Sequence, residues 1–93
     1  MSIMADKSAQ KKILLKTIGK YVKEHRLKSK KGILLLSYEF DISNSSISKL
    51  EAGERDVQIS TLWKIANAFG MDFSDFIREI EERLPENFKL IDN

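Results

Sequence analysis

The apolar residues of the chain recur with the period of an α-helix in several separate stretches. The first runs from about Ser8 to Leu27, where spacings of three and four place one apolar stripe along the helix: Leu14, Ile18, Tyr21 and Val22. Runs in which β-branched and polar residues alternate strictly, as strands require, are missing. The pattern therefore predicts an all-α chain that opens with a long helix.

Polar residues and glycines mark the ends of the next two predicted helices. A lysine-rich break separates the first helix from a short one at about Ile33–Phe40. A turn at Asp41-Ile42 follows, and Ser43 is a good N-cap for a third helix, which runs to about Ala52 and stops at Gly53. These residues predict two short helices joined by a tight turn.

Two further helices are expected after a loop over residues 54–59. The fourth begins at Ser60 or Thr61, and its inward positions are Leu62, Ile65, Ala66 and Phe69. The fifth has Asp72 or Ser74 as its cap and stops at Pro85, with these inward positions: Phe73, Phe76, Ile77, Ile80 and Leu84. The prediction is thus five helices in all.

The charge of the chain is unevenly distributed, although its formal net charge is only +2. Residues 1–31 carry ten Lys/Arg against two Asp/Glu, whereas residues 32–93 carry six against twelve. This asymmetry indicates a basic surface for a polyanion, and a solvated lysine-rich helix is an equally good interpretation. The chain divides into a basic extension (1–12), a helical domain (13–84) and a short tail (85–93).

Several classes of function receive no support from the sequence. The chain has 93 residues and no cysteine, so disulfides, thiolate zinc sites and cysteine nucleophiles are excluded. His25 is the only histidine, and no paired acids, phosphate-binding glycine loop or nucleophile arrangement stands out. We therefore expect no enzyme activity, no metal and no cofactor. A membrane span or secretory segment is also missing, so we expect a cytoplasmic location.

The third predicted helix has one apolar and one polar face. Ile47 and Leu50 lie one turn apart and must face inward, as must Ile42 in the turn before them. The opposite face carries short or flexible polar side chains: Asn44, Ser45, Ser48 and Lys49. Because Ser and Asn are poor residues for a helix interior, this composition favours a surface that enters the major groove of DNA. An ordinary solvated face is the alternative.

Two segments carry a resemblance to a known family. ISNSSISKLEAGER followed by TLWKIANAFG resembles the phage repressor and Cro (XRE-type) family of helix-turn-helix domains, over about Ile18 to Phe76. The matching features are Ser48–Glu51–Gly53, the helix with Leu62, Ile65 and Ala66, and the stop at Gly70. The resemblance implies a five-helix, lambda-repressor-like DNA-binding domain with an extended first helix.

The resemblance also implies roles for individual residues. Arg26 and Glu51 are expected to form a buried ion pair between the first and third helices. Base-reading or groove-facing positions fall at Ser43, Asn44, Ser45 and Lys49, with Ser48 beside them. Phosphate contacts are expected from Lys28, Lys30, Lys31 and Arg55, and from the free backbone N–H groups at the start of the second helix.

The second helix departs from the family pattern. Ile33 stands where the family usually has a polar residue, often glutamine, and Leu34 and Leu35 follow where it has small or acidic residues. Four consecutive apolar residues, 33–36, cannot all face one core on a helical period. A protein partner, a dimer contact or the C-terminal tail would cover them, although scattered exposed aliphatic residues are also normal.

These features predict a transcriptional repressor that binds double-stranded DNA as a homodimer, with the recognition helix at residues 43–52. The dimer surface is expected on the fifth helix and tail, which carry Ile77, Ile80, Leu84, Phe88, Leu90 and Ile91. Packing on the chain's own core is an equally good interpretation for Ile77 and Ile80. The competing function is a protein-binding module, such as an antitoxin that neutralises a toxin and also represses its own operon.

Overall fold

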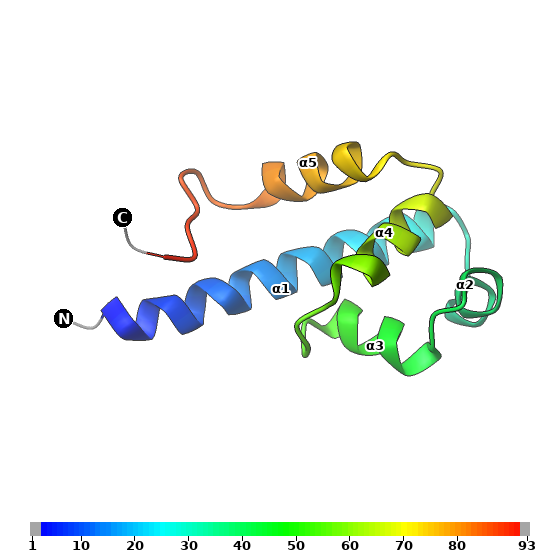
Figure 1. The fold of residues 1–93 in the computed structure, drawn as a ribbon, viewed down its shortest axis with the longest axis horizontal. Helices are drawn as coiled ribbons and strands as arrows, with labels where there is room; N and C mark the ends of the chain where they lie inside the picture. The colour runs from blue at the N-terminus through cyan, green and yellow to red at the C-terminus, as the bar shows by residue number, and fades with distance from the viewer. Residues whose placement is uncertain (1–2, 92–93) are drawn as a thin grey trace.

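A computed structural model describes residues 3–91 of the chain. The helices are α1 (Ile3–Lys28), α2 (Ile33–Phe40), α3 (Asn44–Ala52), α4 (Ile59–Ala68) and α5 (Phe73–Arg83) (Figure 1). These described residues contain five helices and no strand, so the all-α prediction with five helices is confirmed. None of the helices within residues 3–91 combines the length and apolar content needed to cross a membrane.

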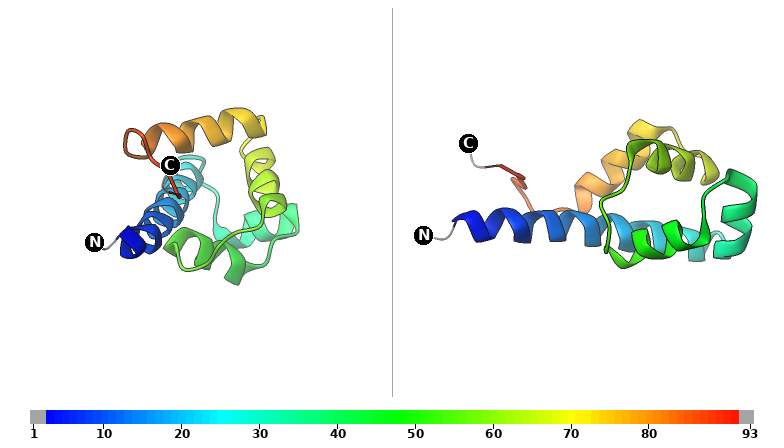
Figure 2. Two further views of the ribbon diagram at one scale, coloured as in Figure 1. Left: turned by 60° about the vertical axis from the view of Figure 1, so that its left-hand side comes forward. Right: turned by 60° about the horizontal axis from the view of Figure 1, so that its bottom comes forward.

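Helix α1 is the longest helix, and α3 and α5 pack against it. It begins at Ile3, five residues before the predicted start, and its 26 residues extend for about 39 Å at 1.5 Å per residue. Its C-terminal half lies among the other helices, whereas its N-terminal half projects beyond them (Figures 1 and 2). Ile18, Tyr21 and Val22 from the predicted apolar stripe are buried.

The hydrophobic core draws one or more residues from every helix. The largest side chains with essentially no exposed surface are Val22 in α1, Leu36 in α2, Ile47 in α3, Ile65 in α4 and Phe76 in α5. Each such burial contributes about 1.5–3 kcal/mol to the free energy of unfolding. Because all five helices share this core, the orientation of α3 depends on the packing of the whole domain.

A glycine allows α1 to approach α3 closely. A Cβ atom at Gly19 would lie 2.5 Å from the carbonyl oxygens of Leu50 and Glu51, closer than real Cβ atoms come to a backbone atom. Gly19 is therefore required by the contact between α1 and α3. This role of Gly19 could not be predicted from the sequence, because nothing along the chain indicates which helix passes over it.

Polar contacts hold α5 against α1. The hydroxyl of Tyr21 donates to Oε1 of Glu79 at 2.6 Å, and Arg83 Nη1 lies 2.8 Å from Glu24 Oε1. The Arg83 guanidinium also covers the Tyr21 ring, 4.9 Å from its centroid. Ile80 lies on the same helix with only 3% of its surface exposed, so its predicted place on a dimer surface is wrong and its side chain belongs to the core.

The C-terminal tail turns back toward the projecting half of α1 (Figures 1 and 2). Gln10 Nε2 in α1 donates to the carbonyl oxygen of Lys89 at 3.2 Å. Of the tail residues predicted at the dimer surface, Phe88 is half-buried, and Leu90 and Ile91 are exposed. The tail thus lies along its own chain.

Candidate nucleic-acid interface

Helix α3 is defined at both ends by its own residues. The hydroxyl of Ser43 accepts the backbone N–H of Ser46 at 3.1 Å and donates to Oγ of Ser46 at 2.7 Å. Gly53 ends the helix in the left-handed conformation, with φ of 70°, a region that favours glycine. Before the helix, Asp41 adopts φ of 55° and lets the chain turn sharply from α2 into α3.

The two faces of α3 are separated as the sequence predicted. Ile47 and Leu50 are buried against the core. The outward face is exposed and carries four predicted groove-facing residues: Asn44, Ser45, Ser48 and Lys49. Ser43 is also exposed, but its hydroxyl is engaged by Ser46 in the helix cap. No role was predicted for Ser46, because the capping signal expected three residues after an N-cap is Glu or Gln and not Ser.

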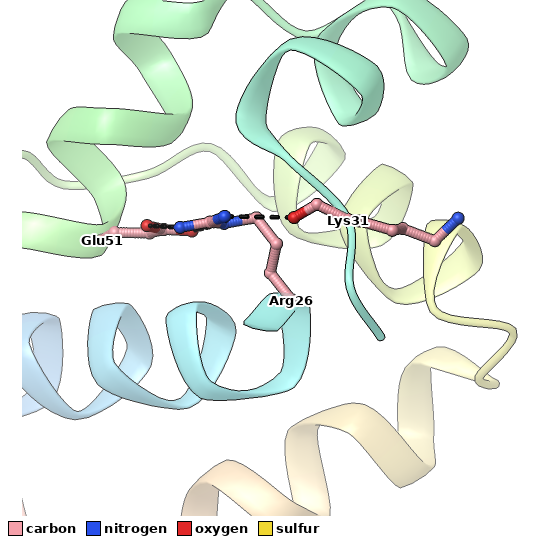
Figure 3. A network of polar contacts seen from close by, with 3 residues as sticks. All are labelled: Arg26, Lys31 and Glu51. Atoms are coloured by element: carbon pink, nitrogen blue, oxygen red, sulfur yellow. Dashed lines mark hydrogen bonds and ion pairs between the residues drawn. The ribbon is translucent and has the colours of Figure 1, made fainter. Parts of the chain in front are cut away.

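Arg26 and Glu51 meet in a buried ion pair (Figure 3). Arg26 Nε donates to Glu51 Oε2 at 2.7 Å, and Nη2 donates to Oε1 at 3.0 Å, which makes the contact bidentate. Arg26 Nη1 also donates to the carbonyl oxygen of Lys31 at 3.1 Å. One guanidinium therefore links α1, α3 and the segment that leads into α2.

The Arg26–Glu51 network is enclosed by the protein. Both side chains are more than nine-tenths buried, so neither is open to a ligand. The hydrogen bond to Glu51 raises the pKa of Arg26 above its already high value, and the guanidinium stays charged. The pair couples the position of α3 to that of the segment before α2.

The expected phosphate-binding residues lie at the end of α1 and in two loops. Lys28 is the last residue of α1 and is exposed, as is Lys30 in the loop that follows. Lys31 is half-buried, and its Nζ lies 3.9 Å from Glu39 Oε1. Gly32 precedes α2 without a side-chain cap, so the first backbone N–H groups of α2 are free to meet an anion. Arg55 is exposed in the loop after α3.

Two lysines of α1 are engaged within the protein. Lys16 Nζ donates to the carbonyl oxygen of Ala52 at 3.1 Å, at the negative end of the α3 dipole. Lys11 Nζ lies 3.3 Å from Asp56 Oδ2 in the loop after α3. Part of the positive charge of the N-terminal segment therefore stabilises the end of α3.

Helix α2 is only partly covered by the core. Ile33 is half-buried and packs against the core. Leu34 and Tyr38 are 72% and 88% exposed, and Leu35 is also exposed. The C-terminal tail, expected as one cover for this helix, lies instead along the other end of α1. The α2 patch (Leu34, Leu35 and Tyr38) is thus an apolar surface beside the basic loop.

The comparisons with known proteins bear on this arrangement of helices. A family model described as helix-turn-helix matches residues 23–76, more than half of the chain. The chain belongs to this helix-turn-helix family. Residues 23–76 include the α2–turn–α3 unit, the Arg26–Glu51 pair and most of the core. The family is one of DNA-binding regulators, so this helix-turn-helix protein is a non-enzymatic, DNA-binding transcription regulator.

A solved structure supports the fold independently. The crystal structure of the clp gene regulator ClgR from Corynebacterium glutamicum is similar with a TM-score of 0.67 and 22% sequence identity. The similarity covers 74% of this helix-turn-helix chain and 73% of the ClgR chain. Among curated proteins, none matches the sequence.

Proposed function

We propose that this protein is a cytoplasmic, sequence-specific repressor that inserts α3 into the major groove of double-stranded DNA and acts as a homodimer. The observation that carries the proposal is the polar, exposed face of α3. The opposite face of α3 is buried and both ends of the helix are capped, so the protein holds this exposed face in a fixed position. A gene regulator among the similar solved structures supports the same class of function.

The side chains on the α3 face suit direct readout of base edges. Asn44 can bond the N6/N7 edge of adenine in a bidentate manner, and Lys49 can bond O6 and N7 of guanine. Ser45 and Ser48 can serve as donor or acceptor, and their small size lets α3 lie deep in the groove. Each good bidentate contact discriminates against the wrong base by about 1–3 kcal/mol.

The loops beside α3 supply the contacts that position the domain without reading sequence. Lys28, Lys30 and Lys31 precede the uncapped start of α2, and Arg55 is exposed in the loop after α3. Each phosphate neutralised adds about −0.9 to the slope of log affinity against log salt concentration. The proposal therefore requires binding that weakens steeply as salt rises.

The salt dependence separates these two kinds of contact. The protein is titrated with a selected DNA duplex at several salt concentrations. We expect Lys30→Gln to weaken binding and to reduce the slope of log affinity against log salt concentration by about one. Asn44→Ala should weaken binding to the selected duplex while leaving the slope unchanged, because no phosphate contact is lost. A wild-type affinity that does not change with salt would refute the interface.

A second candidate function is favoured by the α2 patch. An exposed apolar helix surface next to a DNA-binding element is typical of a protein-binding site, as in an antitoxin that also represses its own operon. Coexpression with the product of the neighbouring reading frame tests this function. Formation of a stable complex that Tyr38→Lys abolishes would support the antitoxin role, and the absence of any complex would exclude that neighbour as a toxin.

A further inference from the structure

The α2 patch is an exposed apolar surface on a helix at the end of the bundle. Among the large hydrophobic side chains that the structure describes, Tyr38 and Leu34 have the largest exposed fractions, 88% and 72%. They lie one turn apart, on the side of α2 opposite the fully buried Leu36. Helix α2 lies away from both the start of α1 and the tail (Figure 1). No segment within residues 3–91 therefore covers the α2 patch.

The α2 patch is held in place on both sides of its helix. Just before α2, the carbonyl oxygen of Lys31 accepts Arg26 Nη1 at 3.1 Å. Just after α2, Lys64 Nζ of α4 donates to the carbonyl oxygen of Asp41 at 3.3 Å. A partner would meet a preformed surface, so little conformational entropy would be lost on binding.

The α2 patch is smaller than a stable interface. Since a large aromatic side chain covers about 150–250 Å², the patch exposes on the order of 400 Å². A stable interface buries about 800 Å² per partner and surrounds an apolar centre with a polar rim. A protein that docks on the patch must therefore also cover the polar surface next to it, and that surface decides the chemistry of the partner.

The polar surface next to the patch is the basic segment at residues 28–31. Lys31 Nζ lies 3.9 Å from Glu39 Oε1, and Glu39 follows Leu35 by one turn on α2. In Figure 3 the carbonyl group of Lys31 points toward Arg26, and the side chain of Lys31 extends away from it. Lys31 therefore borders the α2 patch on the Leu35 side.

The acids near the patch already have lysines beside them. Glu39 faces Lys31, and Asp41 carries the carbonyl oxygen that Lys64 Nζ contacts. Lys28 and Lys30 are both exposed, and none of the ion pairs within residues 3–91 includes either of them. These two ammonium groups remain to be matched by a partner, which favours carboxylates over bases at the rim of the interface.

We infer that the α2 patch binds an acidic protein segment, which packs apolar side chains on the patch and places carboxylates on Lys28 and Lys30. This partner releases the protein from DNA. The release rests on the proposed function, in which the same two lysines meet phosphates. Carboxylates bound there would occupy the ammonium groups and repel the phosphates. Whereas an antitoxin neutralises its partner, here the partner acts on this protein, as an anti-repressor.

Selection from a displayed library of random peptides on the immobilised full chain tests the docking surface. The most enriched peptide is labelled, and its affinity for each variant is measured by fluorescence anisotropy. Leu34→Gln has Ile59→Gln as its matched control, because both residues are exposed aliphatics in the first turn of a helix, at 72% and 65%. The double change Lys28→Gln, Lys30→Gln is matched by Lys20→Gln, Lys23→Gln, which removes two exposed lysines of α1.

We expect the enriched peptides to combine Asp and Glu with Leu, Phe or Trp. Leu34→Gln and Tyr38→Gln should each bind the peptide about tenfold more weakly, as expected for a central anchor of an interface, whereas Ile59→Gln should bind it like wild type. The loss of Lys28 and Lys30 should weaken binding more than the loss of Lys20 and Lys23. Far-UV circular dichroism checks that each variant is folded.

Two results would overturn the docking surface. One is a set of enriched peptides that lack acids, or that bind Leu34→Gln and Tyr38→Gln as tightly as wild type. The other is binding to anionic lipid vesicles that Tyr38→Gln abolishes, because the α2 patch would then be a membrane contact.

Competition between the peptide and a selected DNA duplex tests the release. The peptide should displace the duplex from wild type and not from Tyr38→Gln, which should bind the duplex like wild type because Tyr38 makes no proposed DNA contact. A complex that holds peptide and duplex together would overturn the anti-repressor role.

The same measurements separate this inference from the proposed function. If wild type enriches a DNA motif but no peptide that depends on Leu34 and Tyr38, the inference fails and DNA reading stands. If the peptide depends on these residues and wild type enriches no DNA motif, the docking surface stands, and DNA reading fails together with the release.

Discussion

Replacing Arg26 by methionine should lower the free energy of unfolding by about 3–5 kcal/mol. The change leaves the Glu51 carboxylate buried without the two hydrogen bonds, of 2.7 and 3.0 Å, that it accepts from Arg26. It also removes the donor to the carbonyl oxygen of Lys31. A domain of this size has a total stability of roughly 5–15 kcal/mol, so the loss is a large fraction of the whole. At about 4–8 °C per kcal/mol, the melting temperature should fall by at least about 12 °C.

Burial, rather than charge pairing itself, is the reason for this magnitude. Lys11 and Asp56 also form an ion pair, at 3.3 Å, but their side chains are 58% and 70% exposed. Lys11→Met should therefore cost no more than about 1 kcal/mol, and it serves as the matched control. The double variant Arg26→Met, Glu51→Leu leaves no unpaired charge and should be more stable than Arg26→Met alone.

Urea unfolding followed by far-UV circular dichroism measures these differences in the free energy of unfolding. All variants are compared at one protein concentration, because the stability of a dimer depends on the protein concentration. If Arg26→Met unfolds within about 1 kcal/mol of wild type, as the Lys11→Met control should, the pair does not hold α3 in place. If the double variant is less stable than Arg26→Met, the buried unpaired carboxylate is not the cause of the loss.

Substitutions at three further positions test other contacts by the same unfolding assay. Gly19→Ala should destabilise the domain by about 1–3 kcal/mol, because the added Cβ would meet the carbonyl oxygen of Leu50. Alanine normally stabilises a helix relative to glycine, so a gain in stability would refute the close approach of α1 and α3. Asp41→Gly should be tolerated, whereas Asp41→Val should cost about 1–2 kcal/mol at φ of 55°, and equal stabilities would contradict this. Tyr21→Phe should cost about 1.5–3 kcal/mol through the lost bond to Glu79. Burial and the bond to Glu79 raise the pKa of Tyr21 above its value in the unfolded chain, which is about 10. The stability that the Tyr21 hydroxyl contributes is therefore complete below about pH 10 and is lost as the pH rises further. Tyr21→Phe should not show this loss of stability at alkaline pH.

Much of the helical organisation could be predicted because it depends on local signals. Residues next to the helix ends determine where α2 begins and ends. In the same way, Ser43 determines the start of α3 and Gly53 its end. The separation of α3 into a buried and an exposed face follows from the helical period alone. The start of α1 was predicted five residues late, at Ser8 instead of Ile3, because the regular apolar stripe begins only at Leu14.

The parts that could not be predicted depend on contacts between distant segments. Ile80 and Ile77 occupy the same amphipathic helix, and only the packing on α1 decides that Ile80 is buried and Ile77 exposed. The stacking of Trp63 on Phe73 joins two helices whose relative angle the sequence does not specify. The direction of the tail, along α1 and away from α2, is likewise set by a contact across 79 positions, from Gln10 to Lys89.

The central claim, that the exposed face of α3 reads DNA sequence, is tested most directly by selecting bound sequences from random duplex DNA with wild type, Asn44→Ala and Asn67→Ala. Asn67 is an exposed asparagine of α4, away from the reading face, and serves as the control. The account predicts one enriched motif for wild type and Asn67→Ala, and loss of preference at one or two base pairs per half-site for Asn44→Ala, by about 1–3 kcal/mol each. An identical motif from Asn44→Ala would remove Asn44 from the reading face, and the absence of any enriched motif from wild type would contradict the claim itself.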